Sequence, residues 1–537
     1  MRRDSELREF HAASWDEPLV MELGRRGARG QIFSAPEEDV ATAVGDVASL
    51  IPAGMARRDE PELPELTEFE VQRHYLHLSQ QVLGMMGISL FGTCTMKYNS
   101  KMVEQLISRP ELAETHPLQH PDTLQGTMQI IHDLDLMLRS LSGMQQFVFQ
   151  AGGGADAAYT MAAVTRAYWQ AKGELDTRDE VITSVQAHPC NPATSAAAGF
   201  KVISLPLEEN GYPSLDALKA AVSERTALLM INNPDDMGIY NPEIKEWVKA
   251  VKDVGGLCFY DHANFNGVMG KLSARELGFD ACMFMLHKTF GGPKGGGGPA
   301  VGAFGCSDEL APYLPAPVIA KQGDRYVPDF DRPKSCGKIR EFWGNIPIVV
   351  RAYAWVRAMG ADGIDLASDI SVVANNYMDK KLGQIRGLEK SHPDFPKWRM
   401  EMTRWGLGPM HQDTGVGTVA AANRMADFGI DPWWMSHEPW VVPEPFTPEA
   451  GELWSKEDID QWVAAVQRIS DEAYSEPEVV LNAPHNQPIA KVKGDWMEDP
   501  DQWAMTWRAY LRKHRGTDPV SSAGGVDTAV AAPERRG

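Results

Sequence analysis

Cysteine is scarce in this sequence, and long apolar runs are missing. The six cysteines among 537 residues never have C-x-x-C spacing, so neither a disulfide framework nor a structural zinc site is predicted, and we expect no bound metal. No stretch approaches the roughly 18 uninterrupted apolar residues of a membrane-spanning helix. The N-terminal MRRDSELREF lacks the apolar segment of a secretory signal. We therefore expect a cytoplasmic protein that has no membrane segment.

Basic charge is also in short supply. Lys and Arg number 52 against 73 Asp and Glu, which gives a formal net charge of −21. A sequence-independent nucleic-acid binder needs an excess of Lys and Arg to neutralise phosphates, so no nucleic-acid partner is predicted. The 43% apolar and 23% charged residues are typical of a globular protein.

Short apolar runs alternate with helical patterns in the middle of the chain. Buried strands that alternate with helices predict an α/β fold, with a mostly parallel sheet that is covered on both faces. The expected strands are 146–150, 180–185, 201–207, 227–233, 256–262 and 281–287, and the expected helices are 155–172, 214–222 and 242–254. After about residue 350 helical patterning prevails, which suits a smaller α+β domain.

Composition divides the chain into four regions. Residues 1–73 are rich in Pro and Gly and end in an acidic run, which favours an arm that wraps over a neighbour or over the body of the protein. A large domain is expected over 74–350 and a small C-terminal domain over 351–515. Residues 516–537 are small and polar and cannot bury enough apolar surface to become ordered, so a disordered tail is predicted.

The strongest candidate site joins an aspartate and a lysine. Asp261 in FYDHANFNG and Lys288 in MLHKTFGGPKGGGGP both follow predicted strands, and ligands of parallel sheets bind beyond the carboxyl ends of the strands. This pair suits pyridoxal 5'-phosphate (PLP), because the lysine can form a Schiff base while the aspartate keeps the pyridinium nitrogen protonated. A surface ion pair would be the ordinary explanation, but His287, Thr289 and the glycine-rich loop favour a cofactor site.

Two further segments fit the same cofactor. In FQAGGGADAAYT a strand leads through glycines into a helix, and backbone N–H groups in such a turn can hold a phosphate. His188 follows another predicted strand, and its ring could stack on a flat cofactor. A loop histidine that caps a helix explains His188 equally well, and strand–glycine–helix turns are common.

The run Gly295–Gly298 is interpreted either as a mobile lid or as a second anion-binding loop. Lys294 precedes this run and is the close rival of Lys288 for the Schiff base. We favour Lys288, because it follows the strand directly whereas Lys294 lies inside a flexible loop. Cys190 has no histidine–carboxylate pattern around it and is expected to be structural.

Taken together, these segments resemble the β subunit of the two-subunit glycine decarboxylase, the P-protein of the glycine cleavage system. The similarity extends from about residue 74 to about residue 488. The matching motifs are Phe91–Asn99 (FGTCTMKYN), Asp261–Asn266 (DHANFN), Leu286–Phe290 (LHKTF) with the glycines that follow, Asp329–Ser335 (DFDRPKS) and Asn482–His485 (NAPH).

The resemblance implies a PLP-dependent enzyme of fold type I, with a large, mostly parallel seven-stranded sheet. Glycine would form an external aldimine with the cofactor, lose CO₂ and pass its aminomethyl group to the lipoyl group of the H-protein. An α-type P-protein subunit is implied as partner, in a heterotetramer.

The resemblance also assigns roles to individual residues. Lys288 is the implied Schiff-base lysine, Asp261 the pyridinium partner and His188 the stacking residue. The remaining implied cofactor contacts are Gly153, Gly154, Ala155, Ala263 and His287, and the implied substrate-side residues are Thr95, Lys97, Asn99 and Asn264.

Some positions depart from the family pattern. Asp156 stands where the family has a different turn, and a carboxylate near a phosphate is unfavourable unless it points away. Pro189, Cys190 and Lys294 are further departures, and Asp235 and Asp236 replace a typical Asn-Thr pair. Two alternatives follow: a PLP-dependent lyase, decarboxylase or transaminase for another small amine or amino acid, and a non-catalytic partner subunit with this fold.

Overall fold

The computed structural model describes most of the chain and divides it into two compact units. Residues 100–292, 300–431 and 435–488 are described without a gap; in the flanking regions the described residues are 7, 10–28, 30, 34–57, 63–83, 89–90, 491, 499, 503–504 and 506–515. Unit 1 comprises Met1–Phe10 and Gly84–Ala483, and unit 2 comprises His11–Leu83 and Pro484–Gly537. The predicted tail, 516–537, lies outside the described residues.

Unit 1 is built on a seven-stranded sheet with the order β2-β8-β7-β6-β5-β3-β4. Its strands are β2 (Gln146–Ala151), β3 (Glu180–Ser184), β4 (Lys201–Leu205), β5 (Thr226–Asn232), β6 (Leu257–His262), β7 (Ala281–Met285) and β8 (Gly302–Cys306). All neighbours from β7 to β4 are parallel, whereas β8 is antiparallel to both β7 and β2. The six predicted strands and the mostly parallel α/β sheet are confirmed. The sequence prediction missed β8, because two of its five residues are glycine, which strands disfavour.

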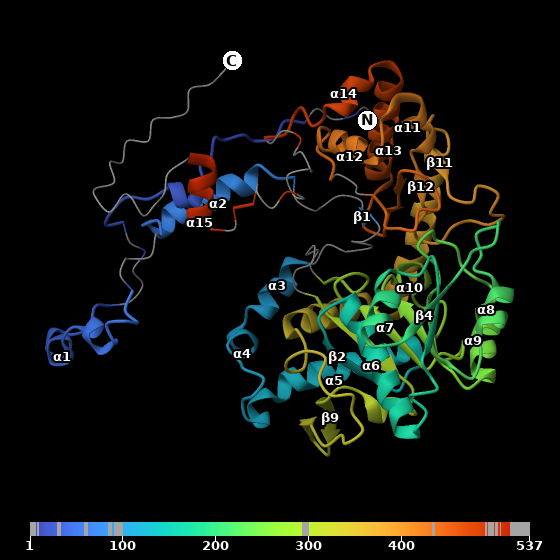
Figure 1. The fold of residues 1–537 in the computed structure, drawn as a ribbon, viewed down its shortest axis with the longest axis horizontal. Coiled ribbons are helices and arrows are strands. Elements are labelled where there is room, and N and C mark those ends of the chain that lie inside the picture. Colours follow the sequence, from blue (N-terminus) through green and yellow to red (C-terminus); the bar gives the residue numbers. More distant parts are fainter. Residues whose placement is uncertain are drawn as a thin grey trace. The chain divides into compact units, whose positions relative to one another are not determined.

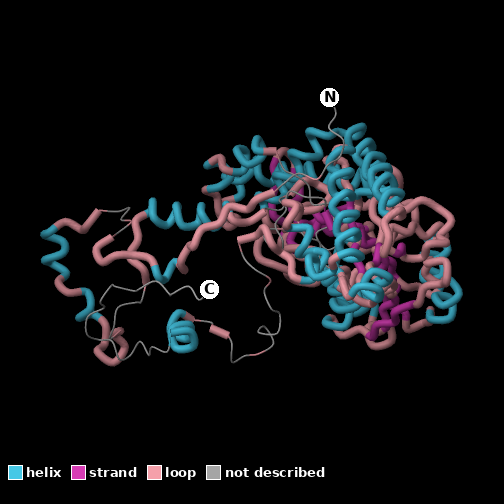
Figure 2. Tube along the Cα trace, turned by 90° about the horizontal axis from the view of Figure 1, so that it is seen from above, coloured by secondary structure: helices cyan, strands magenta, loops and turns pink. Residues whose placement is uncertain are grey.

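Helices cover the sheet, as the strands enclosed by helices in Figure 2 show. The helices between and before the strands are α5 (Gln125–Ser142), α6 (Gly154–Lys172), α7 (Cys190–Ala197), α8 (Leu215–Ala221) and α9 (Ile244–Asp253), all labelled in Figure 1. α9 shows why these segments are helices: it buries Ile244, Trp247, Val248 and Val251, which recur at helical spacing on one face. Two hydrophobic clusters lie against the sheet and these helices.

A long helix leads to a third hydrophobic cluster. α10 (Ile346–Leu382) is interrupted at Gly360; it contributes to the sheet cluster from Ile348 to Ala367 and to the third cluster from Ala374 to Leu382. The third cluster includes α11 (Gly408–Thr414), α12 (Thr418–Ala426), α13 (Lys456–Ser475), α14 (Pro477–Leu481) and the small sheet β11 (Glu389–Lys390), β12 (Trp405–Gly406) and β13 (Pro445–Phe446). The boundaries 1–73, 74–350 and 351–515 stay a prediction.

Unit 2 contains short helices and little core. Its elements include α1 (Glu38–Val44), α2 (Glu68–Gln80) and α15 (Trp507–Tyr510). A capping box between Thr67 and Glu70 begins α2. Among the described residues of unit 2, Ala28 is the sole buried apolar side chain.

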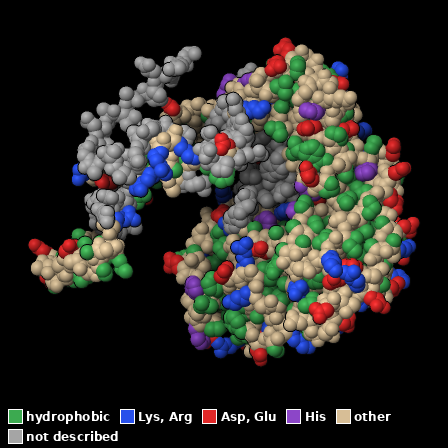
Figure 3. All heavy atoms as spheres, in the orientation of Figure 1, with side chains coloured by type: hydrophobic (Ala, Val, Ile, Leu, Met, Phe, Trp, Pro, Cys, Tyr) green, Lys and Arg blue, Asp and Glu red, His purple; other side chains and the backbone are tan. Residues whose placement is uncertain are grey.

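Charged side chains are spread over unit 1. On the face that Figure 3 shows, acidic and basic side chains are interspersed among apolar ones, so the net charge is not gathered into one patch there. Within the part of the chain that the structure describes, no helix combines the length and apolarity that crossing a membrane requires.

Gly238 fixes a close contact between the loop after β5 and the segment before β12. Its φ is +74°, and its carbonyl accepts a hydrogen bond from the N–H of Met400 at 2.8 Å. A Cβ atom added at Gly238 would lie 1.9 Å from the carbonyl oxygen of Met402. Only glycine combines this backbone conformation with so close an approach.

We expect Gly238→Ala to destabilise the protein more than Gly173→Ala. Gly173 has the same φ, +74°, but a Cβ atom added there has no neighbour within 4 Å. The left-handed conformation should therefore cost about 1 kcal/mol at both positions, and the clash should add about 1–3 kcal/mol at Gly238 alone. Thermal unfolding midpoints measure the difference. Equal midpoints in the two variants would show that the loop relaxes freely.

Candidate active site

The carboxyl ends of β6 and β7 bring Asp261 and Lys288 to one edge of the sheet. β6 and β7 are adjacent and parallel, and Asp261 is paired with Met283 in the ladder. Lys288 follows the end of β7 by three residues, and its side chain is buried, with 7% exposed. Its ammonium is close enough to lower the pKa of Asp261. The structure thus brings together the two residues on which the sequence prediction depends.

Asp261 is held rigidly. Its Oδ1 accepts a hydrogen bond from the N–H of Ala263 at 2.9 Å, and its Oδ2 accepts one from Nδ2 of Asn191 at 3.0 Å. Burial raises the pKa of Asp261 to about 6 against the effect of these donors. A buried carboxylate of this kind needs a cationic partner. Asn191 was not predicted, although it lies in the same segment as His188.

His188 lies at the beginning of α7, after β3. Its Nδ1 accepts a hydrogen bond from the N–H of Cys190 at 3.1 Å, so the helix-capping contact considered for this histidine is present. Burial is the main cause that lowers the pKa of His188 to about 4, and Lys288 contributes in the same direction. The ring is therefore neutral at pH 7, and its uncharged face remains compatible with stacking. Burial also raises the pKa of the Cys190 thiol, which argues against a nucleophilic thiolate.

Asp156, in the first turn of α6, contacts the turn between β2 and α6 and an arginine. Oδ2 of Asp156 accepts a hydrogen bond from the N–H of Gly152 at 3.0 Å and pairs with Nε of Arg340 at 2.5 Å. A Cβ atom at Gly152 would lie 2.9 Å from that Nε, whereas one at Gly153 would meet open space. Arg340 therefore offsets the charge of Asp156 beside the helix N-terminus. The sequence did not predict Arg340, because it lies 184 residues from Asp156.

The other predicted residues are distributed as follows. Gly154 and Ala155 are the first two residues of α6, Ala263 binds Asp261, and His287 contacts the carbonyl of Val301 through Nδ1 at 3.4 Å. Burial lowers the pKa of His287 to about 4. Thr95, Lys97 and Asn99 lie outside the described residues, as do Lys294 and Gly295–Gly298.

Buried polar side chains that the sequence prediction missed surround this core. Asp236 accepts a hydrogen bond from Nδ2 of Asn232 at 2.8 Å and pairs with Nε2 of His437 at 2.8 Å. Arg404 is fully buried, and its Nη1 donates to Oε1 of Gln186 at 2.9 Å. The sequence showed Asp236 only as a departure from the family pattern, and its position after the end of β5 is a further signal that could have identified it as a site residue.

Asn264 and Glu449 complete the site. Nδ2 of Asn264 donates a hydrogen bond to Oε2 of Glu449 at 2.9 Å, and Glu449 is fully buried. Lys288 is near enough to lower the pKa of Glu449, although burial raises it to about 8 overall. Glu449 directly follows residues 432–448, which are rich in Trp and Pro and gave no indication of a site residue.

These residues fit PLP in the chemistry of their side chains. Asp261 offers a buried carboxylate for a pyridinium N–H, Lys288 offers a buried amine, and the N-terminus of α6 with Arg340 offers positive potential for a phosphate.

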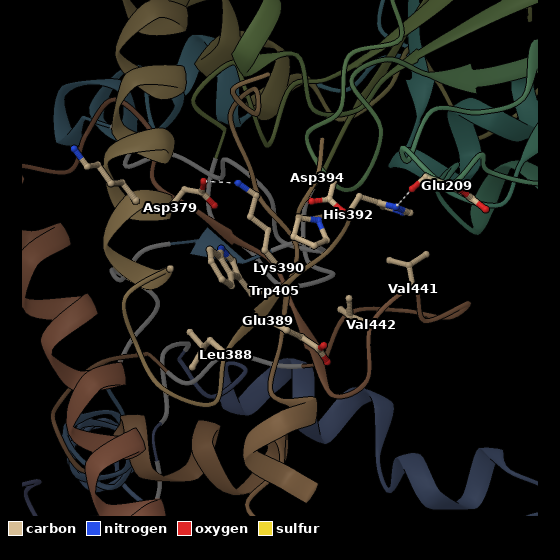
Figure 4. A pocket seen from close by; sticks show the side chains of 13 residues that line it. Glu209, Asp379, Leu388, Glu389, Lys390, His392, Asp394, Trp405, Val441 and Val442 are labelled. Atoms are coloured by element: carbon tan, nitrogen blue, oxygen red, sulfur yellow. Dashed lines mark hydrogen bonds and ion pairs between the residues drawn. The ribbon is translucent and has the colours of Figure 1, made fainter. Parts of the chain in front are cut away.

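A cavity of about 700 Å³ lies elsewhere in unit 1 and is lined by none of the predicted site residues. Figure 4 shows that Lys390 reaches Asp379 there and that His392 faces Glu209. The two contacts measure 2.8 Å from Nζ to Oδ2 and 3.2 Å from Nδ1 to the carbonyl oxygen. Lys390 and His392 are therefore engaged within this cavity.

Known proteins resemble this chain in sequence and in fold. Residues 139–312 match the family described as aminotransferase class-V. A probable glycine dehydrogenase (decarboxylating) subunit 2 from Pyrococcus abyssi is 41% identical over 93% of this chain and 98% of its own length. The proteins of the same name from Thermococcus kodakarensis and Bacillus velezensis are 42% and 37% identical, over 94% and 89% of this chain and 99% and 95% of their own lengths.

Solved structures show the fold alone, because their sequence identity is low. A glycine decarboxylase (P-protein) of the glycine cleavage system, in inhibitor-bound form, has a TM-score of 0.68 at 19% identity and covers 82% of this chain and all of its own. A NifS-like protein has a TM-score of 0.54 at 14% identity, over 72% of this chain and all of its own. Since relatives more than 35% identical span nearly the whole chain, it belongs to the glycine dehydrogenase (decarboxylating) subunit 2 family.

Proposed function

We propose that this protein is the PLP-dependent subunit of a glycine decarboxylase, an oxidoreductase of the glycine cleavage system. The observation that carries the proposal is the buried meeting of Asp261 and Lys288 at the ends of β6 and β7, with Asp261 held by Ala263 and Asn191. The names of the relatives, and that of the P-protein whose structure this fold matches, support glycine as the substrate.

In this proposal Lys288, Asp261 and His188 hold the cofactor. Nζ of Lys288 would hold the cofactor covalently, Asp261 would accept a hydrogen bond from its ring nitrogen, and the neutral ring of His188 would lie against its face. Bound PLP withdraws electrons from the bond between the α-carbon and the carboxylate. Asp261 sustains this effect, because its rigid carboxylate favours the protonated ring nitrogen. The stacked ring and the fixed aspartate together orient the substrate.

The phosphate would lie at the N-terminus of α6, near Gly153, Gly154 and Ala155. Free N–H groups of a first helical turn and the helix dipole favour an anion there. The guanidinium of Arg340 lies over Gly152 and keeps the carboxylate of Asp156 from opposing the phosphate. This arrangement explains how an acid can occupy the turn.

We also propose a partner subunit of the α type, in a heterotetramer, and a lipoylated H-protein as acceptor of the aminomethyl group. "Subunit 2" in the names of the relatives supports a second subunit. The described part of residues 11–83 adds physical support, since it has almost no core yet exposes many large apolar side chains. These include Leu50, Met55, Leu63, Phe69, Tyr75, Leu76 and Val82. The H-protein rests on the family alone.

The cytoplasm is the proposed location. All five cysteines of the described residues are free thiols, which supports the expectation of a reducing compartment.

Lys288→Ala should abolish the visible absorbance band of the cofactor-loaded protein, because no covalent bond to the cofactor can form. Lys271→Ala is the matched control, since Nζ of Lys271 pairs with Asp365 at 2.6 Å on the surface. Borohydride reduction and peptide mapping should place the pyridoxyl group on Lys288. A label on Lys294 would refute this assignment. In the mixture with partner subunit and H-protein, exchange of bicarbonate into glycine should be lost with the band.

Arg340→Gln should weaken PLP retention about fivefold, the scale of a half-exposed ion pair. Asp156→Asn should not weaken it, because the asparagine oxygen can still accept from Gly152 while the unfavourable charge disappears. Equilibrium dialysis against PLP measures both. If Arg340 acted only by neutralising Asp156, the double variant would retain PLP like the wild type; a double variant as weak as Arg340→Gln indicates direct attraction of the phosphate.

Phe69→Ser combined with Leu76→Ser should reduce assembly with the α-type subunit while leaving the cofactor band intact. These side chains are 68% and 51% exposed on α2, so replacing them costs little in the free chain and removes apolar area from a contact. Val373→Ser, at a side chain 69% exposed on α10, is the control. Size-exclusion chromatography of the mixed subunits measures the assembly. Unchanged assembly would exclude this face of α2 from the contact with the α-type subunit.

A further inference from the structure

One carboxylate oxygen of Glu449 accepts a hydrogen bond, whereas the other has no hydrogen-bond partner among the described residues. Oε2 accepts the hydrogen bond from Asn264. Asn264 cannot be turned the other way, because its Oδ1 accepts from the N–H of Asn266 at 3.2 Å. Oε1 is buried and has no hydrogen-bond partner among the described residues. A buried polar atom of this kind is costly unless a ligand satisfies it.

The surroundings of Glu449 keep its carboxyl group neutral. Three charged groups act on it: Lys288 after β7, Asp236 after β5, and Glu401 from the segment before β12. Burial and the two acids raise the pKa of Glu449 to about 8, although Lys288 and Asn264 lower it. Glu401 is itself fully buried with Oε2 unpartnered among the described residues, and burial raises its pKa to about 7. Because Oε2 is occupied as an acceptor, the proton of Glu449 lies on Oε1.

The side chain of Asn264 connects Glu449 to the predicted substrate side. Glu449 belongs to β14 (Pro448–Glu449), where it is paired with Ser89 of β1 (Ser89–Leu90). Asn264, the fourth predicted substrate-side residue, binds Glu449 directly.

We propose that Glu449 is a substrate-binding residue, which donates a hydrogen bond from its neutral carboxyl group at Oε1 to the carboxylate of the bound amino acid. A neutral acid can accept an anionic ligand without charge repulsion, whereas an ionised one would repel it. The proposal rests on the proposed function, because it takes glycine as the ligand. It adds a residue that discriminates an amino acid from a simple amine.

The test uses the cofactor-loaded protein and follows its visible band during titration with glycine or with methylamine, which lacks the carboxylate. Glu449→Gln keeps an acceptor for Asn264 and a donor for the ligand but cannot ionise. Glu449→Met keeps the size and loses both. At pH 7, Glu449→Gln should bind glycine within about threefold of the wild type, whereas Glu449→Met should bind it about tenfold or more weakly, the loss expected for a hydrogen bond to a charged group. Methylamine should bind all three proteins alike.

The pH dependence separates binding from a merely structural role. Above about pH 8 Glu449 ionises, so glycine affinity of the wild type relative to Glu449→Gln should fall about tenfold per pH unit. Glu401→Gln should move this fall to lower pH, because it removes one of the charges that raise the pKa of Glu449.

Three results would count against the proposal in distinguishable ways. If Glu449→Met weakened glycine and methylamine equally, Glu449 would be structural. If Glu449→Gln kept the pH dependence of the wild type, another group would be titrating. If glycine left the band of the wild type unchanged at every pH, both this inference and the proposed function would fall.

Discussion

The carboxylate of Asp261 is the constraint around which this site is arranged. It stands at the end of β6 in a fully buried position, where an ionised group without a cation would cost several kcal/mol. Two neighbours reduce that cost: the N–H of Ala263 and the amide of Asn191 fix both oxygens. Lys288 supplies the positive charge from the adjacent strand. The parallel register of β6 and β7 thus creates the electrostatic requirement and places the group that meets it.

Burial weakens several acids near this pair. Burial raises the pKa of Asp235 and Glu401 to about 7 and that of Glu449 to about 8. At neutral pH these carboxyl groups are therefore partly or mostly protonated. Neutral carboxyl groups can donate hydrogen bonds in a place where ionised ones would repel an amino acid's carboxylate. The net charge of −21 thus overstates the negative potential that a ligand meets inside the protein.

The sequence alone identified the framework of the site because that information is local. Each predicted strand is a short apolar run, and Asp261, Lys288 and His188 lie at or just after strand ends, where a parallel sheet gathers ligand-binding groups. Asn191, Arg340 and Glu449 were missed for the opposite reason. Their contacts join positions 70, 184 and 185 residues apart, and no spacing within one segment encodes them. β8 was not predicted, because its glycines disfavour a strand and its pairing depends on the neighbouring strands β2 and β7.

The contrast between the two units supports the proposed partner subunit. Unit 1 buries three large hydrophobic clusters and can stabilise its own sheet, whereas the described part of residues 11–83 keeps Phe69, Leu76 and Val82 in solvent. Ordering a segment costs about 1–2 kcal/mol per residue in backbone entropy, and burial of apolar area must offset it. A segment without its own core can gain that area only on another surface. In the proposed assembly, residues 11–83 gain their stability from the partner's surface, whereas the proposed catalytic residues all lie in unit 1.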